Sequence, residues 1–100
     1  MNKEEEILEE LAEFFKAFAH PVRLKIIKNL MEGPQCVKNL GENLDMSQPS
    51  ISQHLSILRN KGIVGCRREG SLICYYIKDQ RAKTLFNLLI KEELAWQEKS

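Results

Sequence analysis

The sequence predicts one mainly α-helical domain with a small β-hairpin, and three observations predict it. Apolar residues recur every three or four positions, the spacing of one helix face, through most of the chain. Between residues 63 and 77 the pattern changes to two short β-type runs with a glycine between them. The length of 100 residues, with 43% hydrophobic and 29% charged residues, fits a single folded domain over residues 1–100.

Two helices are predicted in the first third of the chain. His20 and Pro21 separate them, because His20 can cap a helix that starts at Pro21. That second helix should end near Glu32, before a glycine–proline stop signal. The first helix should cover about residues 4–18, with acidic residues on one side and an apolar stripe on the other, formed by Ile7, Leu8, Leu11, Phe14, Phe15 and Phe18.

A short extended stub at residues 35–37 should precede a brief helix that ends at Asp45. Ser47 is a good N-cap for the next helix, which should run to about Asn60. The core stripe of this helix is expected to be Ile51, Leu55 and Leu58. Two short helices joined by a tight turn are typical of a helix-turn-helix.

The runs IVGCRR and LICYYI should form the two strands of the hairpin, joined by a three-residue connection at residues 69–71. A last amphipathic helix is expected over about residues 79–97. A helix-turn-helix followed by a basic hairpin describes a winged helix-turn-helix.

The net charge of +1 hides a segregation along the chain. Residues 1–15 carry a net charge of −5, residues 16–68 carry +6, and the remainder is neutral. The basic middle segment can hold a polyanion, although a solvated surface of mixed charge would show the same composition. Since no apolar run is long enough for a membrane span and the N-terminus is acidic, we expect a cytoplasmic protein with reduced thiols and no membrane partner.

Three segments carry a resemblance to a known family: FFKAFAHPVRLKIIKNL, then SQPSISQHLSILRNKGIV, then RREGSLICYYI. In this order and at these distances they resemble the ArsR/SmtB family of winged helix-turn-helix transcriptional repressors, over roughly residues 10–90. The resemblance implies a homodimer that pairs through its first and last helices and binds double-stranded operator DNA. It also implies that the DNA is released when a metal or a thiol-reactive effector binds.

The helix over residues 47–60 is the candidate DNA reader, because short polar side chains lie opposite its core stripe. Gln53 can pair with adenine, and Arg67 and Arg68 at the hairpin can reach phosphates or a narrow minor groove. Lys38 and Lys61 are weaker phosphate candidates. The remaining candidate DNA contacts are Ser47, Gln48, Ser50, Ser52 and Ser56. The alternatives are a generic polar helix face and a surface arginine pair that serves only solubility.

Two residues near these candidates are expected to be structural rather than DNA-binding. His54 lies on the flank of the core stripe, and Arg23 should pair with a neighbouring carboxylate. For the dimer interface the expected residues are apolar side chains of the terminal helices, with packing inside one chain as the alternative: Ile7, Leu11, Phe14, Phe15, Leu85, Phe86 and Leu89.

The candidate residues for an effector-binding site are the three cysteines. The thiol-based metal site of the family looks like C-x-C, of which this chain keeps only Cys36, with Lys38 at the second position. The last helix has no histidine, so a zinc or nickel site there is disfavoured. With a three-residue hairpin connection Cys66 would face Cys74, and the stub would bring Cys36 close.

Three convergent thiols would suit arsenite, or a reversible disulfide or polysulfide bond without any cofactor. The alternative is that the three cysteines are small buried hydrophobes.

Other classes of protein fit less well. An enzyme is not expected, because neither histidine is placed to meet a cysteine and no glycine-rich phosphate loop or nucleophile elbow is present. The remaining alternatives are a winged-helix regulator without thiol sensing and a winged-helix module that binds proteins, whose binding would not weaken steeply with salt as DNA binding does.

Overall fold

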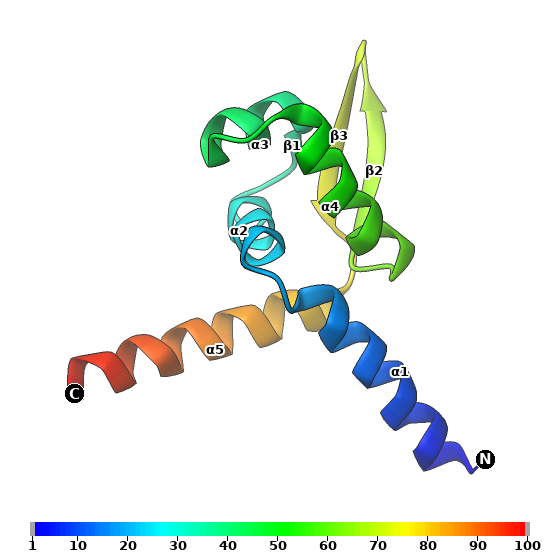
Figure 1. The fold of residues 1–100 in the computed structure, drawn as a ribbon, viewed down its shortest axis with the longest axis vertical. Helices are drawn as coiled ribbons and strands as arrows, with labels where there is room; N and C mark the ends of the chain where they lie inside the picture. Colours follow the sequence, from blue (N-terminus) through cyan, green and yellow to red (C-terminus); the bar gives the residue numbers. More distant parts are fainter. Residues whose placement is uncertain (1, 100) are drawn as a thin grey trace.

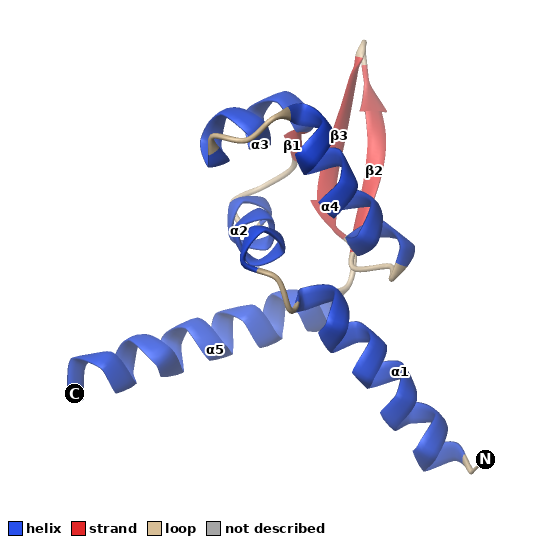
Figure 2. Ribbon diagram, in the orientation of Figure 1, coloured by secondary structure: helices blue, strands red, loops and turns tan. Residues whose placement is uncertain are grey.

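A computed structural model describes residues 2–99 of the chain and contains five helices and three strands in that range (Figures 1 and 2). The expected order of elements is confirmed, and the ends differ from expectation by no more than two residues. The elements are α1 (Lys3–Phe18), α2 (Pro21–Leu30), β1 (Gln35–Cys36), α3 (Val37–Leu44), α4 (Gln48–Asn60), β2 (Val64–Glu69), β3 (Leu72–Ile77) and α5 (Gln80–Lys99).

Side-chain caps set two of the helix starts that the sequence predicts. The Nδ1 atom of His20 accepts a hydrogen bond from the backbone N–H of Val22 at 3.0 Å, at the start of α2. The Oγ atom of Ser47 accepts one from the backbone N–H of Ser50 at 3.3 Å, at the start of α4. Both caps satisfy backbone donors that the first helical turn leaves without an internal partner.

The turn between α3 and α4 is tight because two residues allow it. Asp45 ends α3 in the left-handed conformation, with φ of 53°. At Gly41 a Cβ atom would lie 2.8 Å from the backbone oxygen of Met46, so only glycine lets the chain fold back this closely. The two helices of the helix-turn-helix are therefore fixed against each other by backbone as well as by side chains.

The three strands form one antiparallel sheet with the order β1-β3-β2. Glu69 pairs with Leu72, so the hairpin connection is the two-residue turn Gly70–Ser71, and the expected three-residue connection is wrong. A glycine–serine dipeptide is one of the recognised signals for a two-residue turn, with Gly70 supplying the positive φ of 63°.

One hydrophobic core joins the helices to one face of the sheet. Ile51, Leu55 and Leu58 of α4 are completely buried, which confirms the expected core stripe. They pack with the end of α1, with α2 and with the sheet residues Val64 and Ile77. We call this the inner face of the sheet; it carries Val64, Cys66, Arg68, Ile73, Tyr75 and Ile77.

The terminal helices leave this core in different directions, and we call α1 and α5 the arms and residues 20–79 the body (Figure 1). Only Ala82 is buried in the 20 residues of α5. Among residues 2–99, no helix is both long enough and apolar enough to cross a membrane.

Candidate nucleic-acid interface

Helix α4 presents a polar face on the surface of the body. Its buried stripe fixes the rotation of the helix, so Ser52, Gln53 and Ser56 point away from the core and are exposed. Ser47 and Gln48 are exposed at its N-terminal end, whereas Ser50 is half-buried. Short polar side chains on a rigid exposed helix are what a protein needs to bring backbone and side chains close to base edges.

Lys38 lies on α3, next to the N-terminal end of this face. It shares a surface hollow of about 470 Å³ with the carboxylates of Glu42 and Asp45, beside Ser47 and Gln48. The two acidic residues weaken the attraction of this hollow for phosphate, so Lys38 is a less favourable phosphate contact than a cation without acidic neighbours.

The wing arginines point to opposite faces of the hairpin, because successive residues of a strand alternate. Arg68 is exposed at the wing end of the inner face, opposite Ile73. Arg67 lies on the other face, which we call the outer face and which carries Gly65, Arg67, Glu69, Leu72, Cys74 and Tyr76 together with Cys36. The two arginines could not be assigned to faces from the sequence, because a shift of the register by one residue exchanges the faces.

Arg67 is held in place on the outer face by two neighbours. Its Nε atom donates to Oε1 of Glu69 at 2.8 Å, and its guanidinium lies 5.7 Å from the ring centre of Tyr76. Gly65 makes room for that ring, since a Cβ atom there would lie 2.7 Å from Cζ of Tyr76. By contrast, Arg68 has no ion pair among residues 2–99, which makes it the more available cation of the wing.

A cluster of three side chains joins α4 to α2. The rings of His20 and His54 lie 4.5 Å apart, and Nη1 of Arg23 is 3.3 Å from Nδ1 of His54. Burial lowers the pKa of His54, and the charges of His20 and Arg23 lower it further. As expected, His54 packs inside the fold rather than joining the exposed polar face.

Arg23 is structural, as expected, but its partners differ from expectation. Its Nε atom donates to the backbone oxygen of Ala17 at 2.6 Å, and Nη2 donates to the backbone oxygen of Lys16 at 3.4 Å. Both carbonyl oxygens belong to the last turn of α1, where a cation is favourable, and the Lys16 oxygen also accepts from the backbone N–H of Ala19. The carboxylate partner that the sequence predicts for Arg23 is therefore wrong.

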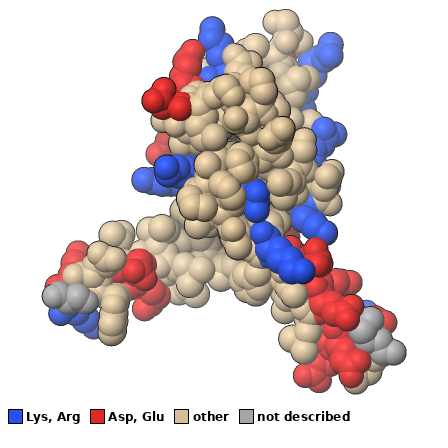
Figure 3. All heavy atoms as spheres, viewed as in Figure 1, with Lys and Arg blue, Asp and Glu red and all other residues tan. Residues whose placement is uncertain are grey.

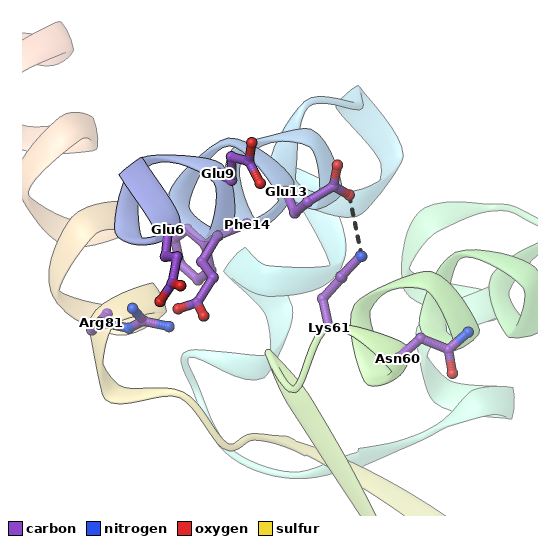
Figure 4. Close-up of a pocket in the computed structure, with 8 residues that line it drawn as sticks. Glu6, Glu9, Glu13, Phe14, Asn60, Lys61 and Arg81 are labelled. Carbon is purple, nitrogen blue, oxygen red and sulfur yellow. Dashed lines mark ion pairs between the residues drawn. The ribbon is translucent and has the colours of Figure 1, made fainter. Parts of the chain in front are cut away.

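The acidic side of α1 bounds the candidate interface (Figure 3). Glu6, Glu9 and Glu13 line a surface hollow of about 710 Å³ beside the end of α4 (Figure 4). Oε2 of Glu13 pairs with Nζ of Lys61 at 3.2 Å. Hydrogen bonds from Lys61 and Lys16 lower the pKa of Glu13, with help from their charges. Lys61, a weak phosphate candidate, is thus already engaged by a carboxylate.

The cysteines divide between the two sheet faces. Cys36 pairs with Cys74 across β1 and β3, as the stub was expected to allow, but Cys66 pairs with Tyr75 and lies on the inner face. The expected pairing of Cys66 with Cys74 is wrong, because the shorter turn shifts the register by one residue. Within residues 2–99 no group of three or more His, Cys, Asp or Glu side chains can hold a metal, so the expected convergence of three thiols does not occur.

The Cys74 thiol has a polar neighbour on the outer face. Its Sγ atom donates to Oε2 of Glu69 at 3.5 Å, the carboxylate whose other oxygen holds Arg67. Burial raises the pKa of the Cys74 thiol, and the hydrogen bond and charge of Glu69 raise it further. The sequence offered no sign of this contact, since Glu69 was expected to lie in the connection between the strands.

Three of the seven apolar residues expected at a dimer interface are exposed on the arms: Ile7, Phe15 and Leu89 are 45%, 50% and 55% exposed. Leu11, Leu85 and Phe86 are half-buried, the last two against the core of the same chain. Phe14 is buried against Phe18 inside the chain. An apolar groove of about 480 Å³ runs between α2 and α5, and its lining includes Leu24, Leu85, Phe86, Leu89 and Ile90.

Together, the paired helices α3 and α4, the three-stranded sheet and the projecting hairpin define a winged helix-turn-helix protein. Comparisons with known proteins give the family. Residues 20–65 match the family model described as bacterial regulatory protein, arsR family. An HTH-type transcriptional regulator of Methanocaldococcus jannaschii is 48% identical over 82 residues, which cover 81% of this chain and 92% of the relative. The chain belongs to the ArsR family of regulatory proteins, which are DNA-binding transcription regulators and not enzymes.

Two further relatives extend this comparison. The biofilm growth-associated repressor of Xylella fastidiosa is 39% identical over 80 residues, which cover 80% of this chain and 70% of the relative. The solution structure of a homodimeric winged helix-turn-helix DNA-binding domain from Mycobacterium bovis superposes with a TM-score of 0.91 at 27% identity. That match covers 100% of this chain and 93% of the Mycobacterium bovis chain.

Proposed function

We propose that this chain is a homodimeric, cytoplasmic transcriptional repressor that binds operator DNA and releases it on a thiol-directed signal. The observation that carries the DNA-binding part is the exposed polar face of α4, which three completely buried residues hold in one orientation. The signal belongs to one of two classes, a thiophilic metal or metalloid, or an oxidant or reactive sulfur species, and it acts through the cysteines.

In this proposal α4 enters the major groove and reads bases with its polar face. Gln53 is long enough for a bidentate contact to adenine, while the short side chains of Ser52 and Ser56 let the helix approach the base edges closely. Ser47, Gln48 and Ser50 surround the N-terminus of α4, where the helix dipole favours a phosphate group. The body supplies the cations around this face, whereas the acidic side of α1 repels DNA and limits the footprint.

The wing contributes sequence-independent contacts. Arg68 is its main cation, because no carboxylate among residues 2–99 pairs with it, and Arg67 and Lys38 are secondary. Phosphate contacts of this kind set the position of the protein on the duplex, and the base contacts of α4 set the sequence preference.

A second copy of the chain completes the proposed repressor. One winged helix makes few contacts, and two copies related by a two-fold axis would read two half-sites. The exposed apolar residues of the arms and the groove between α2 and α5 support pairing through these elements. The homodimeric relative from Mycobacterium bovis, which matches over the whole of this chain, supports it as well.

The test is binding of the purified, reduced protein to the DNA upstream of its own gene, followed by fluorescence anisotropy across a salt series. Log affinity should fall linearly with log salt, with a slope of about −0.9 per phosphate neutralised. Gln53→Ala should lose about tenfold in preference for the cognate sequence, while Asn87→Ala on α5 serves as the matched control and should not change it. Affinity that is insensitive to salt would instead identify a module that binds proteins.

A further inference from the structure

Two thiols face each other on the outer face of the sheet. Cys36 in β1 and Cys74 in β3 are direct partners in the antiparallel register. Residues opposite each other on one sheet face have Cβ atoms about 4.5–5.5 Å apart, so both sulfur atoms can reach one bound atom between them. Both cysteines are free thiols, and at 7% and 8% exposed they are nearly but not completely covered.

The sheet restricts this site to two sulfur ligands. Cys66 faces the opposite side and cannot reach the pair. No third His, Cys, Asp or Glu side chain completes a ligand group within residues 2–99. Zinc, which takes four ligands in a structural site, would therefore find only two of them here. Arsenite, which binds three thiolates, would lack its third ligand.

We propose that Cys36 and Cys74 form a two-thiolate site for a soft divalent cation that is satisfied by two sulfur ligands, for which Hg²⁺ is the probe. Two thiolates bring two negative charges, so a divalent ion leaves a neutral site. A monovalent soft ion would leave a net negative charge in a nearly buried position close to the Glu69 carboxylate, which is unfavourable.

Binding is an exchange of two protons for the cation. Each S–H bond breaks, each sulfur forms a bond to the metal, and no electrons are transferred. Oε2 of Glu69, 3.5 Å from Sγ of Cys74, is placed to accept the Cys74 proton. Because the Glu69 side chain is 52% exposed, it can pass that proton to water.

The location of this pair links it to the DNA-binding elements, and this step rests on the proposed repressor function. Cys36 is the N-cap residue of α3, the first helix of the helix-turn-helix. Cys74 lies in a wing strand and shares Glu69 with Arg67. Loss of the Cys74 proton removes a hydrogen-bond donor from Glu69, so ion binding changes the environment of the wing and the start of α3 together, and it should weaken DNA binding.

The first experiment measures Hg²⁺ binding by the full chain, reduced, in the presence of glutathione as a competing thiol. Native mass spectrometry counts the ions per chain, and the thiolate-to-mercury absorption band reports the ligands. The wild type and Cys66→Ala, the matched control, should retain one ion per chain. Cys36→Ala and Cys74→Ala should bind about 100-fold more weakly, since a single thiolate has no second ligand at high effective concentration.

The same measurement is repeated with serine in place of alanine at Cys36, Cys66 and Cys74. Circular dichroism establishes that each variant is folded. The inference is overturned if Cys36→Ala and Cys36→Ser hold the ion as tightly as the wild type. It is equally overturned if Cys66→Ala loses as much affinity as Cys74→Ala.

The second experiment adds the upstream DNA to the same proteins. Without mercury all of them should bind DNA, and failure of every protein to do so would contradict the proposed function without touching the ion site. With one ion per chain, the wild type and Cys66→Ala should bind DNA at least about tenfold more weakly, within the usual range of coupling between two sites. Unchanged affinity of the mercury-loaded wild type would overturn the regulatory role of the pair.

Discussion

The body and the arms of this molecule differ in how completely they are folded by their own contacts. In the body, Ile26, Ile27, Leu40, Ile51, Leu55, Leu58 and Ile63 have no exposed surface at all. The arms carry most of the large apolar side chains that remain exposed, including Ile7, Leu8, Phe15, Leu88, Leu89, Ile90 and Leu94. The core of the body is therefore closed within one chain, with the end of α1 and the start of α5 packed against it, whereas the exposed apolar surface of the arms is of the kind that marks contact with another protein.

Charge separates the body from the α1 arm. Six glutamates lie on the α1 arm, and most lysines and arginines of the chain belong to the body (Figure 3). A polyanion is therefore attracted to the body and repelled by the α1 arm. In the proposed dimer this division keeps the DNA-reading elements and the pairing elements from competing for the same partner.

Removing a core side chain of the body should have the largest effect. Leu55→Ala deletes a completely buried side chain in the centre of α4, which should lower the free energy of unfolding by about 3 kcal/mol. The matched control is Ile57→Ala, on the same helix but 41% exposed. Urea denaturation followed by circular dichroism measures both. Equal losses for the two variants would mean that α4 is not packed in the orientation described.

Disrupting an arm should act on assembly instead of on the fold. Leu89→Asp places a charge on α5 in the groove beside α2, and we expect monomers that keep their helical content. Affinity for an operator with two half-sites should fall about 100-fold, because the second half-site contact is no longer intramolecular. Analytical ultracentrifugation and anisotropy measure the two effects. Asn87→Ala, also exposed on α5, is the control, and a Leu89→Asp protein that stays dimeric would refute the role of this groove.

The two wing arginines offer a smaller test within the body. Arg68→Ala should weaken binding to all DNA sequences roughly fivefold and reduce the salt slope by about 1, as expected for one lost phosphate contact. Arg67→Ala should have the smaller effect, because Glu69 already pairs with this guanidinium at 2.8 Å. Salt-dependent anisotropy with specific and random duplexes measures both variants. The reverse order of effects would show that the outer face of the wing contacts DNA.

The sequence predicted the body well because its signals are local. The helix spacing of Ile51, Leu55 and Leu58, the Ser47 cap and the change to β-type runs each depend on a few neighbouring residues. The polar face of α4 followed from the same spacing, without any tertiary information. These local signals are enough to define a winged helix-turn-helix.

The sensor geometry could not be predicted in the same way, because it depends on register. A hairpin turn of two residues instead of three moved Cys66 to the inner face and left Cys36 and Cys74 together. The contacts of Arg23 with the carbonyl oxygens of Lys16 and Ala17 depend on how α1 ends against α2, which no local pattern reports. Which apolar residues of the arms are covered depends on a second chain, and local patterns in one sequence do not report that either.

The smallest expected effect is a difference between the body and the α1 arm in how their contributions to stability depend on pH. Burial lowers the pKa of His54 in the body, so the folded state favours neutral histidine. The stability that His54 contributes should be complete above its ordinary pKa of 6.5 and should be lost as the pH falls below it. Ion pairs with Lys61 and Lys16 lower the pKa of Glu13 in the α1 arm, so its contribution should be lost only as the pH falls below 4.5.

Thermal unfolding across both pH intervals separates the two contributions. His54→Asn retains a side-chain acceptor for Arg23 but cannot be protonated, so it should flatten the decline in Tm that begins below pH 6.5. Glu13→Gln should leave that decline intact and flatten only the part below pH 4.5. Because Glu13 is a surface group whose ion pairs contribute little, its effect should be the smaller of the two and should disappear at high salt. If His54→Asn leaves the upper interval unchanged, the titrating group there is not the histidine packed between α2 and α4.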